Sequence, residues 1–101
     1  MVNEEKQRRE FGRWVLLLGL NNSEPYGAWE EVLVSIVQGM YADATRNEVR
    51  RALDYLSERG LVHVKKNPDG RWFGKLTRLG VDVVEYTVSC EPGIARPEKI
   101  G

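Results

Sequence analysis

The chain has 101 residues, which is enough for one domain with a modest core and excludes a second domain. It carries 15 basic and 15 acidic side chains, and a net charge of zero counts against a protein whose affinity comes mainly from counterion release on nucleic acid. The longest apolar run, residues 14–18, is too short to cross a bilayer, and the single cysteine, Cys90, cannot form an internal disulfide. The amino terminus has mixed charge rather than a signal-peptide pattern, so we expect a cytoplasmic protein.

Residues 4–20 have the apolar spacing of a helix. Four apolar side chains recur at i, i+3, i+4 and i+7, and three leucines widen the stripe: Phe11, Trp14, Val15 and Leu18, with Leu16, Leu17 and Leu20. A helix this apolar is expected to be buried on more than one side. Either the domain core covers all of it, or the core covers one side and a second subunit covers the other.

Residues 21–43 are predicted to contain a turn, a second helix and a connection. Turn-forming residues fill positions 21–27, and residues 25–27 are a candidate short strand beside the later hairpin. Helical spacing resumes over residues 28–38, although the β-branched residues there weaken the helix prediction. Residues 39–43 then connect this helix to the next one.

Residues 45–59 carry a complete set of helix signals. Thr45 followed by Glu48 is a capping box, in which the Thr hydroxyl accepts a first-turn N–H and the Glu side chain reaches back to the N–H of the cap. Gly60 supplies the stop, because it can adopt the left-handed conformation that satisfies the last carbonyls. Four apolar side chains share one face, which is expected to be buried: Val49, Ala52, Leu53 and Leu56.

The opposite face of this helix carries chemical groups that suit DNA. Arg46, Asn47, Arg50 and Arg51 are predicted to lie on it in the first two turns. A guanidinium can donate two hydrogen bonds to guanine, an Asn amide can pair with adenine, and either can hold phosphate near the positive end of a helix. Arg and Asn are also common on any solvated helix, so this face alone does not distinguish a DNA-binding helix from an ordinary one.

Two short strands are predicted after Gly60. They lie within residues 61–66 and 71–76, and Asn67-Pro68-Asp69-Gly70 joins them as a turn. Strand alternation places Trp72 and Phe73 on opposite faces, so that one packs inward and the other is available to a partner.

The last part of the chain is predicted to be a helix followed by a tail. Thr77 is the N-cap of a helix that runs to about residue 88, with a strand as the alternative because the segment is rich in valine. Residues 89–101 contain two prolines and no periodicity, so they are expected to be extended. This tail is either disordered or lies along the domain with Ile94 and Ile100 as anchors.

The order of these elements, a capped helix, Gly60-Leu61, a hairpin and then Leu76-Thr77-x-x-Gly80, resembles the winged helix-turn-helix family. The tail motif Pro92-Gly93-Ile94-x-Arg96-Pro97 resembles the small winged-helix proteins of Mu-like prophages. The resemblance implies an α+β winged helix-turn-helix domain over residues 1–88, with three to four helices and a two-stranded β-hairpin wing, followed by a tail at 89–101. It also implies a phage or prophage origin and a DNA-associated role.

The distribution of charge supports this interpretation. Residues 44–78 hold 9 Lys or Arg and 4 Asp or Glu, a balance of +5, whereas residues 1–43 and 79–101 have balances of −3 and −2. We therefore predict a DNA-binding protein that regulates transcription or a phage-related process. The residues expected to read bases are Arg46, Asn47 and Arg50. Those expected to contact phosphates are Arg51, Lys65, Lys66, Arg71 and Lys75.

A protein-interaction module on the same scaffold is the alternative function, for which the zero net charge and the apolar wing are the arguments. Because dimeric helix-turn-helix proteins match two half-sites on double-stranded DNA, and apolar residues are in surplus in the first helix and the final segment, we expect a homodimer. No enzyme activity, cofactor or metal is expected. His63 is a lone strand histidine, Cys90 lacks an orienting group, and no Cys or His cluster is present.

Overall fold

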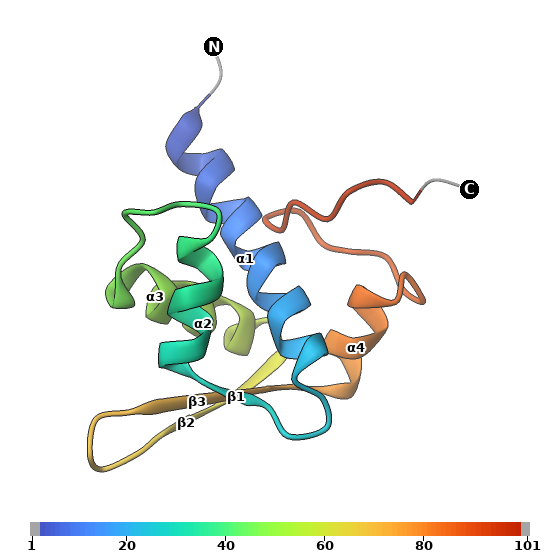
Figure 1. Ribbon diagram of the computed structural model, residues 1–101. Coiled ribbons are helices and arrows are strands. Elements are labelled where there is room, and N and C mark those ends of the chain that lie inside the picture. The colour runs from blue at the N-terminus through green and yellow to red at the C-terminus, as the bar shows by residue number, and fades with distance from the viewer. Residues whose placement is uncertain (1–2, 100–101) are drawn as a thin grey trace.

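The computed structural model describes residues 3–99, and this part of the chain contains four helices and one three-stranded antiparallel sheet (Figure 1). The helices are α1 (Glu4–Asn22), α2 (Glu30–Gln38), α3 (Arg46–Glu58) and α4 (Arg78–Val84). The strands are β1 (Ala28–Trp29), β2 (Val62–Lys66) and β3 (Trp72–Leu76). The prediction of an α+β chain with three to four helices and one hairpin is confirmed.

β3 is the central strand of the sheet, between β1 and β2. The β2–β3 hairpin turns where the sequence predicts, because the Asn67 N–H donates to the Arg71 carbonyl at 2.9 Å and the Gly70 N–H donates to the Asn67 carbonyl at 2.9 Å. The short strand lies at residues 28–29, however, and not at 25–27. The Ser23 carbonyl accepts from the N–H groups of Tyr26 and Gly27, so the preceding residues form a turn and only the next two pair with β3.

The core lies between the sheet and the helices, which stand on one side of the hairpin (Figure 1). α1 contacts α2, α3, α4 and β3, so its apolar surface is buried on several sides within the same domain. Among the described residues of α1, Leu18 is the one large apolar side chain that is exposed, at 38 %. The most deeply buried leucines come from three helices: Leu16, Leu17, Leu20, Leu33, Leu53 and Leu56.

The ends of α3 follow the predicted signals with one difference. The Thr45 hydroxyl accepts from the Glu48 N–H at 3.2 Å, and Gly60 has a φ of +75° that lets the Leu61 N–H reach the Leu56 carbonyl at 2.9 Å. The second half of the capping box is replaced. The Glu48 carboxylate accepts two hydrogen bonds from Arg8 of α1, each 2.8 Å long, because a charged partner across the helix interface binds it more strongly than a backbone N–H.

α4 is shorter than predicted and is followed by an irregular segment. The Thr77 hydroxyl caps the helix by accepting from the Gly80 N–H at 3.0 Å, but the helix ends at Val84 and not near residue 88. Tyr86, with a φ of 62°, adopts a left-handed conformation that turns the chain away from the helix axis.

Residues 89–99 contain no helix or strand, yet they pack on the domain. Ile94 is buried at 8 % exposure, and the Ala95 N–H donates to the Glu10 carbonyl of α1 at 3.1 Å. Arg96 donates to the carbonyls of Val83 and Val88, each at 2.9 Å. Of the two alternatives for the tail, the structure shows the one in which it lies along the domain with Ile94 as an anchor. Ile100, the second predicted anchor, lies outside the described residues.

Candidate nucleic-acid interface

An ion pair between α2 and α3 holds the hairpin beside α3. Glu30, in the first turn of α2, is only 1 % exposed, and its two carboxylate oxygens accept from Nε and Nη2 of Arg50, each at 2.6 Å. The same Nη2 donates to the Gly70 carbonyl at the tip of the hairpin, also at 2.6 Å. One guanidinium therefore links three elements that are separate in the sequence.

The environment of Glu30 favours its charged form. The hydrogen bonds from Arg50 are the main cause of a lowered pKa for the Glu30 carboxyl, burial opposes this effect, and the charge of Arg50 and the backbone of Trp72 reinforce it. The position of Glu30 at the positive end of α2 acts in the same direction. The carboxylate is thus a permanent anchor for Arg50 at neutral pH.

Trp72 forms the floor beneath this ion pair. The guanidinium carbon of Arg50 lies 4.7 Å from the centroid of the Trp72 ring, and Nζ of Lys66 lies 4.3 Å from it. Lys66 also pairs with Asp54 of α3 at 3.3 Å. Trp72 and Phe73 lie on opposite faces of β3, as strand alternation predicts, and it is Trp72 that packs toward the helices. Phe73 packs edge-on against Trp29, with 5.1 Å between the ring centroids.

The side chains of α3 point in three directions besides the core. Asn47 and Arg51 point away from the side that Val49, Leu53 and Leu56 bury, since residues of an α-helix are spaced at 100°. Arg46 and Arg50 turn toward α2 and the hairpin, and Glu48 turns toward α1. The prediction that the four polar residues at 46, 47, 50 and 51 lie on an outward face is therefore wrong for Arg50, while Arg46, Asn47 and Arg51 are exposed.

Arg50 differs most from its predicted position. We placed it on the outward face as a base-reading residue, but its guanidinium is bound to Glu30 and Gly70 and lies over Trp72. Glu30 lies 20 residues earlier in the chain, so no local sequence pattern predicts the ion pair between Glu30 and Arg50. Direct contact of Arg50 with bases stays a prediction, and it requires that these bonds be exchanged for bonds to DNA.

Three of the predicted phosphate-contacting residues already have acidic partners. Lys66 pairs with Asp54, Arg71 with Glu31 at 3.1 Å, and Lys75 with Glu24 at 2.8 Å. Glu24, Glu30 and Glu31 come from the negatively charged first part of the chain, so the folded molecule offsets much of the positive balance of residues 44–78. Arg71 also lies over Trp29, with 4.1 Å from its guanidinium carbon to the ring centroid.

The remaining predicted cations are more available. The Arg46 side chain is 63 % exposed, and its Nε lies 4.0 Å from the nearest Glu30 oxygen. Arg51 and Lys65 are exposed and make no ion pair within residues 3–99. Lys65 is opposite Phe73 in the sheet register, so it projects from the face of the hairpin that the helices leave uncovered.

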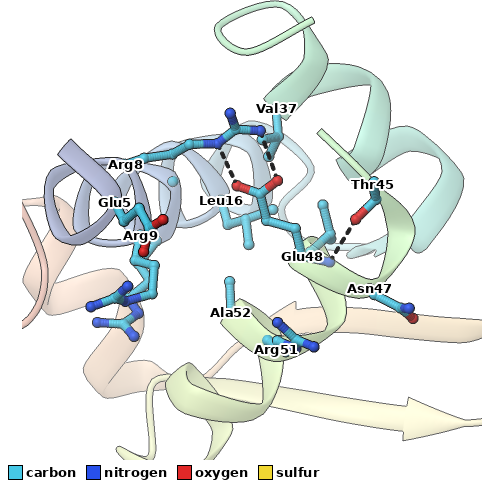
Figure 2. Close-up of a pocket in the computed structure, with 13 residues that line it drawn as sticks. Glu5, Arg8, Arg9, Leu16, Val37, Thr45, Asn47, Glu48, Arg51 and Ala52 are labelled. Atoms are coloured by element: carbon cyan, nitrogen blue, oxygen red, sulfur yellow. Dashed lines mark hydrogen bonds and ion pairs between the residues drawn. The ribbon is translucent and has the colours of Figure 1, made fainter. Parts of the chain in front are cut away.

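No role was predicted from the sequence for the cations of α1, yet the fold brings them next to α3. Figure 2 shows Arg8 and Arg9 of α1 on one side of a pocket and Asn47, Glu48 and Arg51 of α3 on the other. Arg9 and Arg13 are four residues apart and therefore share one helix face, next to the apolar stripe of α1. This spacing could have identified them from the sequence as a pair of neighbouring cations.

Comparison with known proteins supports the fold. The chain matches no protein-family model and no curated protein sequence. It is similar to the crystal structure of a "putative DNA-binding protein" from Ralstonia eutropha JMP134, with a TM-score of 0.61 and 18 % sequence identity. The similarity covers 87 % of this chain and all of the other, so the two share a fold over nearly their whole length. No helix within residues 3–99 is long and apolar enough to span a membrane.

Proposed function

We propose that this chain is a winged-helix DNA-binding protein, with α3 as the recognition helix, the β2–β3 hairpin as the wing, and no catalytic activity of its own. The observation that carries the proposal is the link from Glu30 through Arg50 to Gly70, which fixes the wing beside α3 while Arg46, Asn47 and Arg51 stay exposed. A pre-organised pair of elements loses little conformational freedom when it binds a duplex. The fold shared with the Ralstonia protein supports the same proposal.

The exposed residues divide by their proposed roles. Arg46 and Asn47 read base edges in the major groove, and Arg51 and Lys65 contact phosphates. Lys66, Arg71 and Lys75 contribute less, because each must exchange a carboxylate for a phosphate. The resemblance of the tail motif to Mu-like prophage proteins supports a role in transcriptional or phage-related regulation. The alternative, a protein-interaction module, is favoured by the acidic partners that offset these cations.

Binding to duplex DNA tests the proposal directly. A preferred site is selected from random duplexes with the wild-type chain at low salt, and fluorescence anisotropy then measures the affinity of each variant. We expect Arg46→Ala to weaken binding to this site by about 1–3 kcal/mol, roughly 5- to 150-fold, because one base contact is lost. Lys65→Ala should weaken binding to duplexes of every sequence by the same factor. It should also reduce the dependence of the affinity on salt concentration by about one released counterion.

The matched control is Arg78→Ala, which removes a more exposed arginine, 88 % against 63 % for Arg46, from α4 and should leave DNA affinity unchanged. Circular dichroism confirms that each variant is folded. Failure of the wild-type chain to bind any duplex at low salt, where electrostatic attraction is strongest, would refute DNA binding and leave the interaction module in its place.

We also propose that the protein acts as a homodimer, which would match two half-sites on DNA. Leu18 of α1 and Leu79 of α4 are exposed at 38 % and 44 %, and they are the apolar residues that the core leaves uncovered on these helices. Light scattering at about 50 μM, above the dissociation constant of an ordinary specific interface, should give the mass of a dimer. Leu18→Glu should shift that mass toward the monomer, and a monomeric wild-type chain would contradict the proposal.

A further inference from the structure

A groove of about 500 Å³ runs between the amino-terminal half of α1 and the first turns of α3 (Figure 2). Leu16, Val37 and Val49 lie buried beneath its floor, at 0 %, 3 % and 1 % exposure, and the partly exposed Gly12 and Ala52 form the apolar surface of the groove. Arg8 and Glu48 pair across one side and join the two helices there. The groove is thus a built feature of the helix packing, separate from the hairpin.

Gly12 lies in the groove at the middle of α1, where the sequence gives no local reason for a glycine. Glycine destabilises a helix interior relative to alanine. A Cβ built on Gly12 would have no heavy atom within 4 Å, so nothing in residues 3–99 packs there and requires its absence. A glycine at such a position lets another backbone approach the helix closely.

The charges around the groove are mostly positive. Four arginines line it against Glu5 and Glu48, a balance of +2: Arg8, Arg9, Arg13 and Arg51. Within residues 3–99 neither Arg9 nor Arg51 has an ion-pair partner. The groove therefore has unneutralised guanidinium groups on both of its helices.

Arg13 is held in a fixed position among these charges. Its guanidinium carbon lies 3.5 Å from the centroid of the Tyr55 ring, and Nη1 donates to the Gly93 carbonyl at 2.8 Å. Burial lowers the pKa of Arg13 and the charges of Arg9 and Arg59 add to this effect, whereas Tyr55 and Glu10 act in the opposite direction. An anionic group that binds beside Arg13 would relieve this accumulation of like charge.

We propose that the groove binds an acidic amphipathic helix of a partner protein, with its aliphatic side chains over Gly12 and Ala52 and its carboxylates on Arg9, Arg13 and Arg51. This occupant fits both the apolar lining and the positive charge of the groove, as is usual for a helix bound between two helices. A DNA backbone fits less well, because it has no aliphatic side chains to fill the lining and would meet the carboxylates of Glu5 and Glu48.

The probe is a fluorescent helical peptide of about 16 residues with Leu at i, i+4 and i+7 and Glu on the flanking positions, long enough to form a helix when bound. Fluorescence anisotropy with the full chain should show saturable binding. Gly12→Leu fills the groove, Arg9→Glu reverses one charge, and each should weaken binding by at least about tenfold. Lys6→Glu is the matched control, since it changes the same charge on α1 outside the groove, and it should alter affinity less than about twofold.

A second peptide, with Ser in place of Leu and the same charge, should bind at least about tenfold more weakly, because it cannot fill the apolar lining. The proposal is overturned if the Leu peptide does not bind at about 1 mM, if Gly12→Leu binds it as well as the wild type does, or if the Ser peptide binds equally well. Duplex DNA is titrated in parallel. Because Arg9 and Gly12 have no role in the proposed DNA interface, equal losses of duplex and peptide binding in both variants would assign the groove to nucleic acid instead.

Discussion

Arg50→Ala is expected to destabilise the fold by about 3 kcal/mol, because it leaves the carboxylate of Glu30 buried without its partner. We place the value at the lower end of the range for a broken buried ion pair, since a quarter of the Arg50 side chain is exposed and water can reach the vacated space. Chemical denaturation at pH 7 measures the change. Arg71→Ala is the matched control, because its partner Glu31 is half exposed, and it should leave the denaturation midpoint nearly unchanged.

The pH dependence identifies Glu30 as the cause. In the wild type the lowered pKa of Glu30 contributes stability that is present above the unfolded-state pKa of about 4.3 and is lost as the pH falls through the folded-state value. In Arg50→Ala the buried carboxyl is instead easier to protonate, so acid relieves its penalty. The stability difference between the two proteins should therefore begin to shrink above about pH 4.3, where the variant takes up its proton, and continue to shrink below it as the wild type takes up its own. The double variant Glu30→Leu/Arg50→Met should recover most of the loss at pH 7. A difference that is independent of pH would contradict this explanation.

Gly80→Ala is expected to destabilise the fold by about 3 kcal/mol, the upper end of the usual cost of overpacking. A Cβ on Gly80 would overlap the backbone carbonyl oxygen of Leu61 and lie 3.1 Å from Cδ2 of Leu76. The carbonyl cannot move away freely, because it accepts from the Thr77 N–H at 3.0 Å. α4 would have to shift off the end of the hairpin.

Gly12→Ala supplies the contrast for this experiment. Its Cβ meets no heavy atom within 4 Å, so alanine should raise the stability by up to about 1 kcal/mol through helix propensity alone. Thermal unfolding followed by circular dichroism measures both variants. Gly80→Ala with a melting temperature equal to that of the wild type would show that α4 does not pack as closely on Leu61 as the structure indicates.

The features predicted correctly from the sequence are those that local chemistry determines. The caps at Thr45 and Thr77 depend on hydroxyls within a few residues of the N–H groups that they bind, and the stop at Gly60 and the turn at residues 67–70 depend on backbone bonds between near neighbours. The short strand was misplaced by a few residues because its pairing depends on β3, more than 40 positions later. Local patterns also specify which face of α3 is buried, but they do not specify what lies on either side of it.

The candidate site was less predictable for the same reason. Arg50 and Glu30 are 20 residues apart, Arg71 and Glu31 are 40 apart, and Arg8 and Glu48 are 40 apart. Charge counted along the sequence separates a basic segment from acidic ones, whereas folding brings the two together. Arg46, Asn47 and Arg51 keep the exposure that their sequence positions suggest, and these are the residues on which the DNA proposal now rests.

The segment around Gly93 and Ile94 determines when the domain can finish folding. Arg13 and the Gly93 carbonyl are 80 positions apart, and Tyr55 reaches the neighbouring Pro92 carbonyl across 37. During synthesis this segment emerges after every element that it covers. Part of the surface of α1 therefore stays in water until then, including the ring of Trp14, which packs against Tyr86 in the folded protein. Contacts between such distant positions form slowly, because a long loop must close before they are gained. We therefore expect the native state to be completed late in folding, with Trp14 among the last side chains to leave water.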